Sequence, residues 1–228
     1  MDATRSDTSP RIAALVVFPA ILTLAVTILR LVGELQQWGS PWVANAHGGS
    51  DFAILGVTWL PIFFGPYFAW KLIKSGFGPS SVGAAVAAAI GSVVVFVAGS
   101  VVAGYTETHP GILTLVGFLI TLAAAFIPGK GWRTFGVTLL TYAFAARIPV
   151  AIVMLIAMSA HGGQGLGTHY DVVGSQFAAL APTWVRKFVL FGLIPQMTLW
   201  IGWTAAIGSL AGTLVTAIFG FGKRPATA

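Results

Sequence analysis

The sequence predicts an all-α, polytopic membrane protein: a bundle of six transmembrane helices, several of them kinked by proline. The 228 residues are 57% hydrophobic and only 8% charged, the mean hydropathy is +0.89, and the apolar residues fall into long runs. A soluble domain carries about 25% charged residues. This chain has too few charges to cover a water-facing surface, so we expect the lipid bilayer to be its solvent.

Six apolar stretches are candidates for transmembrane helices. A hydrocarbon core of about 30 Å needs about 20 helical residues, and the first five stretches fit one helix each. The sixth is too long for one upright helix and too short for two. It is either one tilted helix or an interfacial turn leading into a span, with a bend near Pro195. The six stretches are residues 12–33, 52–72, 82–104, 111–128, 135–159 and 188–219.

The distribution of lysine and arginine predicts the orientation. Cytoplasmic loops carry an excess of these residues. With a cytoplasmic N-terminus, the outer loops hold only Arg186 and Lys187, while Arg30 and Arg147 lie within helices. The cytoplasmic ends then carry the other eight: Arg5, Arg11, Lys71, Lys74, Lys130, Arg133, Lys223 and Arg224. We therefore expect both termini in the cytoplasm, and the protein in a bacterial cytoplasmic membrane.

The same topology defines one transmembrane domain with two tails. Residues 1–11 and 220–228 are expected to be short cytoplasmic tails, and residues 12–219 to form the single domain. Its outer loops are residues 34–51, 105–110 and 160–187.

All four histidines and four of the six acidic residues fall on the predicted outer side. Loops on a rigid scaffold often carry function, and neutral imidazole and carboxylate are ligands for zinc, copper, iron and manganese. A transition-metal site is therefore one hypothesis, although the spacing matches no ligand motif. The other interpretation is that polar side chains are simply tolerated there. The candidate ligands are His47, Asp51, His109, His161, His169 and Asp171.

Arg147 is the one charged residue expected deep in the bilayer. It lies 14 residues beyond Arg133 in the fifth predicted helix, about 21 Å from the inner boundary. A charge at this depth costs at least about 2.5 kcal/mol. Two interpretations stay open: an anchor for an anion or headgroup, or a charge that reaches an outer carboxylate or the Ala145 carbonyl freed by Pro149.

We expect the ligand pocket to face outward, near Arg147. The other candidate ligand-binding residues are Arg30, Glu34, Glu107 and Tyr170. Arg30 is the weaker candidate because it lies near a helix end, where its side chain can reach the interface unaided.

Prolines and small residues shape the predicted helices. Kinks are expected at Pro19, Pro61, Pro66, Pro149 and Pro195. Small residues at four-residue spacing let helices approach closely, inside the bundle or in a homo-oligomer. Two such rows are Gly83, Ala87 and Gly91, and Gly208, Gly212 and Thr216.

The tetrapeptide AHGG occurs twice, at residues 46–49 and 160–163. Glycine is favoured just past a helix C-terminus, and a histidine in the last turn faces the negative end of the helix dipole. Each copy is therefore expected to end a helix. Whether His47 and His161 share a pocket or point into water is left open by the sequence.

Three functional hypotheses follow. The favoured one is a pocket that binds a lipid or small amphiphile, or a subunit of a membrane complex. The second is a membrane-embedded, metal-dependent enzyme with its site at the outer face. The spacing of the candidate metal ligands, which matches no known motif, counts against it. The third is a small oligomeric transporter or channel, which would need polar groups at several depths. No nucleotide-binding or nucleophile motif is present, and no basic run suggests nucleic acid.

Overall fold

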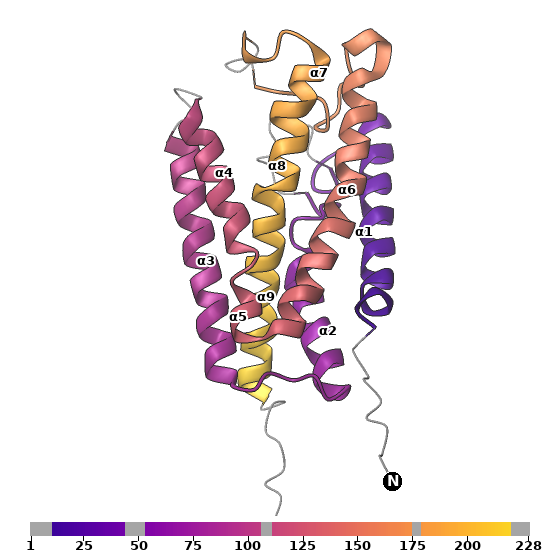
Figure 1. Ribbon diagram of the computed structural model, residues 1–228. Coiled ribbons are helices and arrows are strands. Elements are labelled where there is room, and N and C mark those ends of the chain that lie inside the picture. Colours follow the sequence, from indigo (N-terminus) through magenta and orange to yellow (C-terminus); the bar gives the residue numbers. More distant parts are fainter. Residues whose placement is uncertain (1–10, 44–52, 106–110, 175–178, 220–228) are drawn as a thin grey trace, which may run out of the picture.

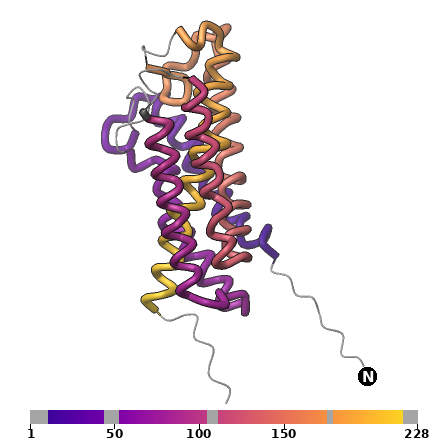
Figure 2. Tube along the Cα trace, turned by 60° about the vertical axis from the view of Figure 1, so that its left-hand side comes forward, coloured from indigo at the N-terminus to yellow at the C-terminus, as the bar shows by residue number. Residues whose placement is uncertain are grey.

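The computed structural model describes residues 11–43, 53–105, 111–174 and 179–219, and within these ranges it contains helices and no strands. The long helices run along one common axis (Figure 1), and a view turned by 60° shows the same elongated bundle (Figure 2). The elements are α1 (Ile12–Leu35), α2 (Leu60–Lys74), α3 (Val82–Tyr105), α4 (Ile112–Ala124), α5 (Pro128–Gly131), α6 (Arg133–Gly163), α7 (Trp184–Lys187), the π-helix η2 (Phe188–Leu193), α8 (Ile194–Met197) and α9 (Leu199–Phe219).

Five helical segments are long and apolar enough to cross a membrane: α1, α3, α4 with α5, α6, and the run from α7 to α9. Large apolar side chains also cover the outside of the bundle. On α3, Ile90, Val94, Val97 and Val101 are each at least 50% exposed. Such a surface is compatible with lipid rather than water, so the fold is that of a multi-pass integral membrane protein.

The second predicted span is shorter than expected. The sequence suggested a helix over residues 52–72, but α2 begins only at Leu60 and has 15 residues, about 22 Å. Pro61 lies in the first turn, where a proline is tolerated. Residues 53–59 before it are not helical. Consequently α2 occupies only the lower part of the bundle (Figure 1).

Non-helical backbone at this depth needs hydrogen-bond partners from the protein. The indole Nε1 of Trp203, in α9, donates to the carbonyl of Thr58 at 2.7 Å. The indole Nε1 of Trp59 donates to the carbonyl of Ile54 at 3.1 Å. Two tryptophans thus satisfy carbonyls of the segment that leads into α2.

The last span is a single broken segment of 36 residues, Trp184–Phe219. The bend predicted near Pro195 is confirmed: the π-helix η2 ends at Leu193, and Thr198 leaves helical geometry with φ −123° and ψ −78°. Proline removes a helical donor and its ring clashes with the carbonyl four residues earlier. A wider π-turn accommodates this clash, which explains the position of η2.

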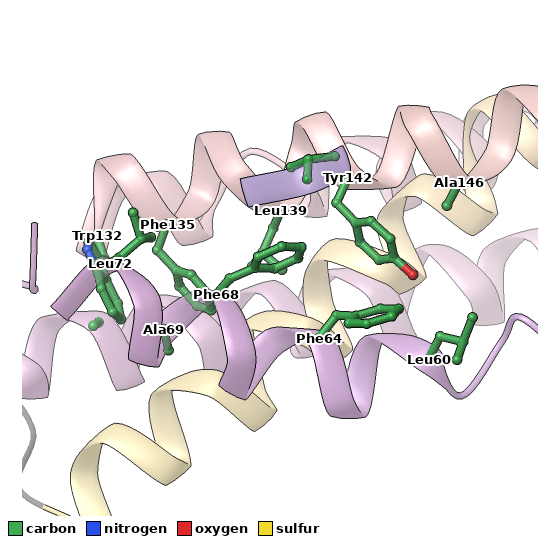
Figure 3. Close-up of a cluster of buried hydrophobic side chains, with 12 residues drawn as sticks. Leu60, Phe64, Phe68, Ala69, Leu72, Trp132, Phe135, Leu139, Tyr142 and Ala146 are labelled. Carbon is green, nitrogen blue, oxygen red and sulfur yellow. The ribbon is translucent and has the colours of Figure 1, made fainter. Parts of the chain in front are cut away.

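The core lies between α2 and α6. Figure 3 shows Phe64 and Phe68 of α2 facing Phe135, Leu139 and Tyr142 of α6. The ring centres of Phe64 and Tyr142 are 5.2 Å apart in an edge-to-face arrangement. Aromatic pairs of this kind add stabilisation beyond their buried area.

The small residues of α9 pack inside this bundle. A Cβ on Gly65 of α2 would collide with the carbonyl oxygen of Gly208, and a Cβ on Gly212 would meet the Phe135 ring at 2.5 Å. On α3, in contrast, Gly83 and Ala87 are exposed. A homo-oligomer through the α3 row stays a prediction.

Basic residues gather at one end of the bundle. In Figure 1 the lower end holds the last turn of α2 and the start of α6, with Lys71, Lys74 and Arg133. The end that carries Glu34 and Arg186 is called the upper end below. The direction of the bundle across the membrane stays a prediction.

Candidate functional site

An apolar pocket of about 900 Å³ lies between the α3–α4 pair and the α7–α9 segment. Its walls include Phe96 of α3, Leu115 and Phe118 of α4, and Leu190 of η2. Ligand sites of small molecules have this size and are mostly apolar. The pocket is therefore large enough for an acyl chain.

The pocket runs from the upper end of the bundle to its middle. Arg186, in α7, borders it near the top, and Trp200, in α9, borders it near the bottom. These residues are 14 positions apart on one broken helical segment, about 21 Å at helical rise. The Arg186 side chain is exposed and supplies the one formal charge among the described residues of the lining.

Trp200 and Trp203 together form the deep end of the pocket, which we call the floor. The Trp203 ring packs edge-on against Phe96, with ring centres 5.7 Å apart, and its Nε1 donates to the Thr58 carbonyl. The Trp200 ring instead contacts the guanidinium of Arg147, whose central carbon is 4.9 Å from the ring centre.

Arg147 is buried in the middle of α6, at 2% exposure. Its Nη2 donates a long hydrogen bond of 3.4 Å to the Thr204 hydroxyl, and its Nε has no hydrogen-bond partner. Contact with an aromatic face is worth about 2 kcal/mol for a desolvated cation. The Trp200 ring is thus the principal stabilising contact of this charge within the described residues.

The acidic partner expected for Arg147 is not Glu34. Among the described residues Glu34 pairs with Arg30 and His169 and does not pair with Arg147. The Ala145 carbonyl also receives no hydrogen bond from this guanidinium. Glu107 and Asp51, two other acidic residues of the predicted outer side that could serve as this carboxylate, lie outside the described residues.

Glu34 is the centre of a second polar site, at the upper end of α1. Its side chain is 1% exposed, and it accepts from Nε of Arg30 at 2.8 Å and from the backbone N–H of His169 at 2.9 Å. The Nδ1 of His169 lies 2.5 Å from Glu34 Oε1, although not in the alignment of a hydrogen bond. Burial lowers the pKa of His169, against the opposing effect of Glu34.

The polar site fastens residues 164–174 to α1, and we call this segment the latch loop. The hydroxyl of Tyr170 donates to the Thr27 carbonyl at 3.1 Å, and burial raises the pKa of that hydroxyl. Within the loop, Asp171 accepts from the Thr168 backbone N–H at 2.8 Å and from its hydroxyl at 2.6 Å. Gly165 has φ +90°, and a Cβ there would collide with the Asp171 carboxylate.

The AHGG copy at residues 160–163 ends α6, as predicted. His161 is left-handed with φ 51° and ψ 40°, and Gly162 follows with φ 71°. The His161 side chain is exposed. It therefore does not belong to the polar site, and its counterpart His47 lies outside the described residues.

The structure does not bring the candidate metal ligands together into one described site. The described residues hold no group of three or more His, Cys, Asp or Glu that could hold a metal ion. His169 lies against Glu34, whereas Asp171 is engaged by its own loop. His47, Asp51 and His109 lie outside the described residues, so a metal site stays a prediction.

The sequence predicted a pocket near Arg147, but not the residues that line this apolar pocket. None of the described candidates Arg30, Glu34, Arg147 and Tyr170 lines it, and Arg147 lies behind Trp200. The available signal was a pair of tryptophans, Trp200 and Trp203, on one face of a helix below Arg186. Interface anchoring explains most such tryptophans, so the signal was weak.

The fold and the pocket define a class: a helical, multi-pass integral membrane protein with an apolar pocket in the upper half of its bundle. Comparison with protein-family models, with curated proteins and with solved structures finds no match.

Proposed function

We propose that the protein binds an amphiphile with one long acyl chain and an anionic headgroup. The observation that carries this proposal is the apolar pocket of about 900 Å³ with Arg186 at its upper border. The acyl chain lies along the pocket, and the carboxylate or phosphate of the headgroup lies beside Arg186. With both termini in the cytoplasm of a bacterial cell, the ligand comes from the outer leaflet.

Three buried threonines give no support to transport of an anion or a proton. Thr23, Thr27 and Thr138 each donate to the carbonyl four residues earlier in their own helix. A hydroxyl engaged in this way satisfies its own helix. Its one proton is then engaged, so these three threonines offer no free donor to an anion or to a proton relay.

The proposal is tested by displacement of a fluorescent fatty acid from the purified full-length protein in nanodiscs. Long-chain fatty acid and lysophosphatidylglycerol are the two anionic ligands, and a long-chain alcohol is the uncharged one. Arg186→Gln should weaken binding of both anions about fivefold, as for an exposed charge pair. Lys187→Gln, at the neighbouring residue that does not line the pocket, should leave binding unchanged.

A second pair of variants tests the position of the acyl chain. Ser100 borders the pocket, so Ser100→Phe should fill it and reduce binding at least about tenfold. The neighbouring Val101 is 64% exposed and does not line the pocket, so Val101→Phe should bind normally. Equal behaviour of these two variants, or no displacement by any ligand, would overturn the proposal.

A further inference from the structure

We infer that Trp200 sets the length of acyl chain that the pocket accepts, and that Arg147 is the positioning residue that holds Trp200 in place. This inference rests on the proposed function and names its specificity-determining residues. It starts from the difference between the two tryptophans of the pocket floor.

Trp203 is fixed by neutral contacts. Its indole N–H donates to the Thr58 carbonyl at 2.7 Å, and its ring packs on Phe96. The orientation of this ring is therefore determined by hydrogen bonding and packing, independently of any charge.

Trp200 is held differently. The contact that the structure describes for its ring is the guanidinium of Arg147, 4.9 Å from the ring centre. The ring therefore contacts a buried cation, while the residue also borders the pocket. It lies two positions after Thr198, where the backbone leaves helical geometry. The ring thus depends on Arg147 for its orientation.

Arg147 has little else to bind. Its one hydrogen bond, to Thr204, is 3.4 Å long, and its Nε has no partner although the residue is 2% exposed. A planar guanidinium stacks well on aromatic faces. Removing the Trp200 ring would extend the pocket toward this cation, and more methylenes of a chain would then be buried.

The chain-length limit is measured with a series of saturated fatty acids from octanoate to behenate, each displacing the fluorescent probe from the full-length protein in nanodiscs. For the unaltered protein, affinity should rise with chain length, reach a maximum and then fall. Trp200→Ala should move the maximum to longer chains. Two further buried methylenes correspond to about a tenfold gain in affinity for the chains beyond the original maximum.

Variants at Arg147 test whether this residue orients the Trp200 ring or only contributes to the stability of the fold. Arg147→Met should flatten the maximum and shift the tryptophan fluorescence, whereas Arg147→Lys, which keeps a cation over the ring, should retain the maximum. Trp42→Phe, at an exposed tryptophan that does not line the pocket, should keep it as well. Trp200→Phe, with a smaller ring, should move the maximum by less than Trp200→Ala and serves if the alanine variant does not fold.

The outcomes distinguish this inference from the proposed function. If no fatty acid displaces the probe from the unaltered protein, the proposed function fails and this inference fails with it. If fatty acids bind but Trp200→Ala and Trp200→Phe keep the original maximum, the inference alone is overturned. A series without any maximum in the unaltered protein overturns it too.

Discussion

Glu34 and Arg147 are both charged and almost fully buried, but their surroundings differ. Glu34 accepts hydrogen bonds from Arg30 and from the His169 backbone, and the His169 ring lies against it. Arg147 has one long hydrogen bond and an aromatic ring, and its Nε has no partner. The first charge is fully engaged by the protein, and the second is not.

This difference separates a structural role from a functional one. A buried charge whose partners are all in place stabilises only that arrangement, and it has no capacity left for a ligand. A buried charge without its full set of partners costs free energy. Such a cost is typical of sites that serve function rather than stability. Glu34 fastens the latch loop, whereas Arg147 fits the positioning role that we propose for it at the pocket floor.

The largest change in the free energy of unfolding is expected from Glu34→Ala. The substitution leaves Arg30 and the His169 N–H without their acceptor. Breaking a partly buried pair in this way should lower the free energy of unfolding by about 3 kcal/mol. The measurement is chemical unfolding in mixed micelles. Glu34→Gln, whose amide oxygen can still accept from the His169 N–H, should lose less, and equal stability of all three proteins would contradict a fastening role.

Arg147→Leu should change stability in the opposite direction. The substitution loses the contact with Trp200 but removes a buried charge that has no acidic partner among the described residues. The free energy of unfolding should rise by about 1 kcal/mol, measured in the same micelles. A loss as large as that of Glu34→Ala would show that Arg147 is as fully engaged as Glu34, and the comparison would fail.

Much of the fold could be predicted from the sequence, because hydropathy directly reports long apolar helices. The bend near Pro195 and the helix end at residues 160–163 were also predictable, since proline and glycine act through local backbone geometry. The length of α2 was not, because the non-helical segment before it is as apolar as a helix. What keeps it non-helical includes a tertiary contact, the hydrogen bond from Trp203 to Thr58.

The candidate site was predicted only in part. Titratable residues do gather at the upper end, since Glu34, His169 and Asp171 lie close to one another or in one loop. Glu34 and Asp171, however, accept their hydrogen bonds from α1 and from the latch loop rather than from a ligand. The pocket is made by apolar residues from helices far apart in the sequence, and its walls have no compositional signal in a chain that is apolar throughout.

An effect smaller than that of Glu34→Ala is expected from Tyr170→Phe, which tests the latch loop without changing charge. The substitution removes one buried hydrogen bond, to the Thr27 carbonyl, and should cost about 1 kcal/mol. Amide hydrogen exchange in residues 164–174 should become faster, while exchange in α6 is unchanged. Tyr67→Phe, at a tyrosine of α2 for which the structure describes no hydrogen bond, is the control. Equal exchange in both variants would contradict the latch.

The smallest effect is expected from pH. Burial lowers the pKa of His169 below its ordinary value of 6.5, while Glu34 opposes the shift and Arg30 adds to it. Because the attached loop favours the neutral ring, the stabilisation is complete above pH 6.5 and is lost as the pH falls through the lowered pKa. The carboxylates of Glu34 and Asp171 both favour the protonated ring, so the net effect should be smaller than that of Tyr170→Phe.

Amide hydrogen exchange of the latch loop tests whether the loop becomes less stable as the pH falls. Relative to a reference peptide that corrects for intrinsic exchange, protection of residues 164–174 should decrease between about pH 7.5 and about pH 5.5, around the ordinary histidine pKa. His169→Gln cannot protonate in this range and should abolish the decrease. His161→Gln, at the exposed histidine that ends α6, should retain it. Protection that increases as the pH falls would mean that Glu34 outweighs burial, and the polar site would then be an ion pair with a charged histidine.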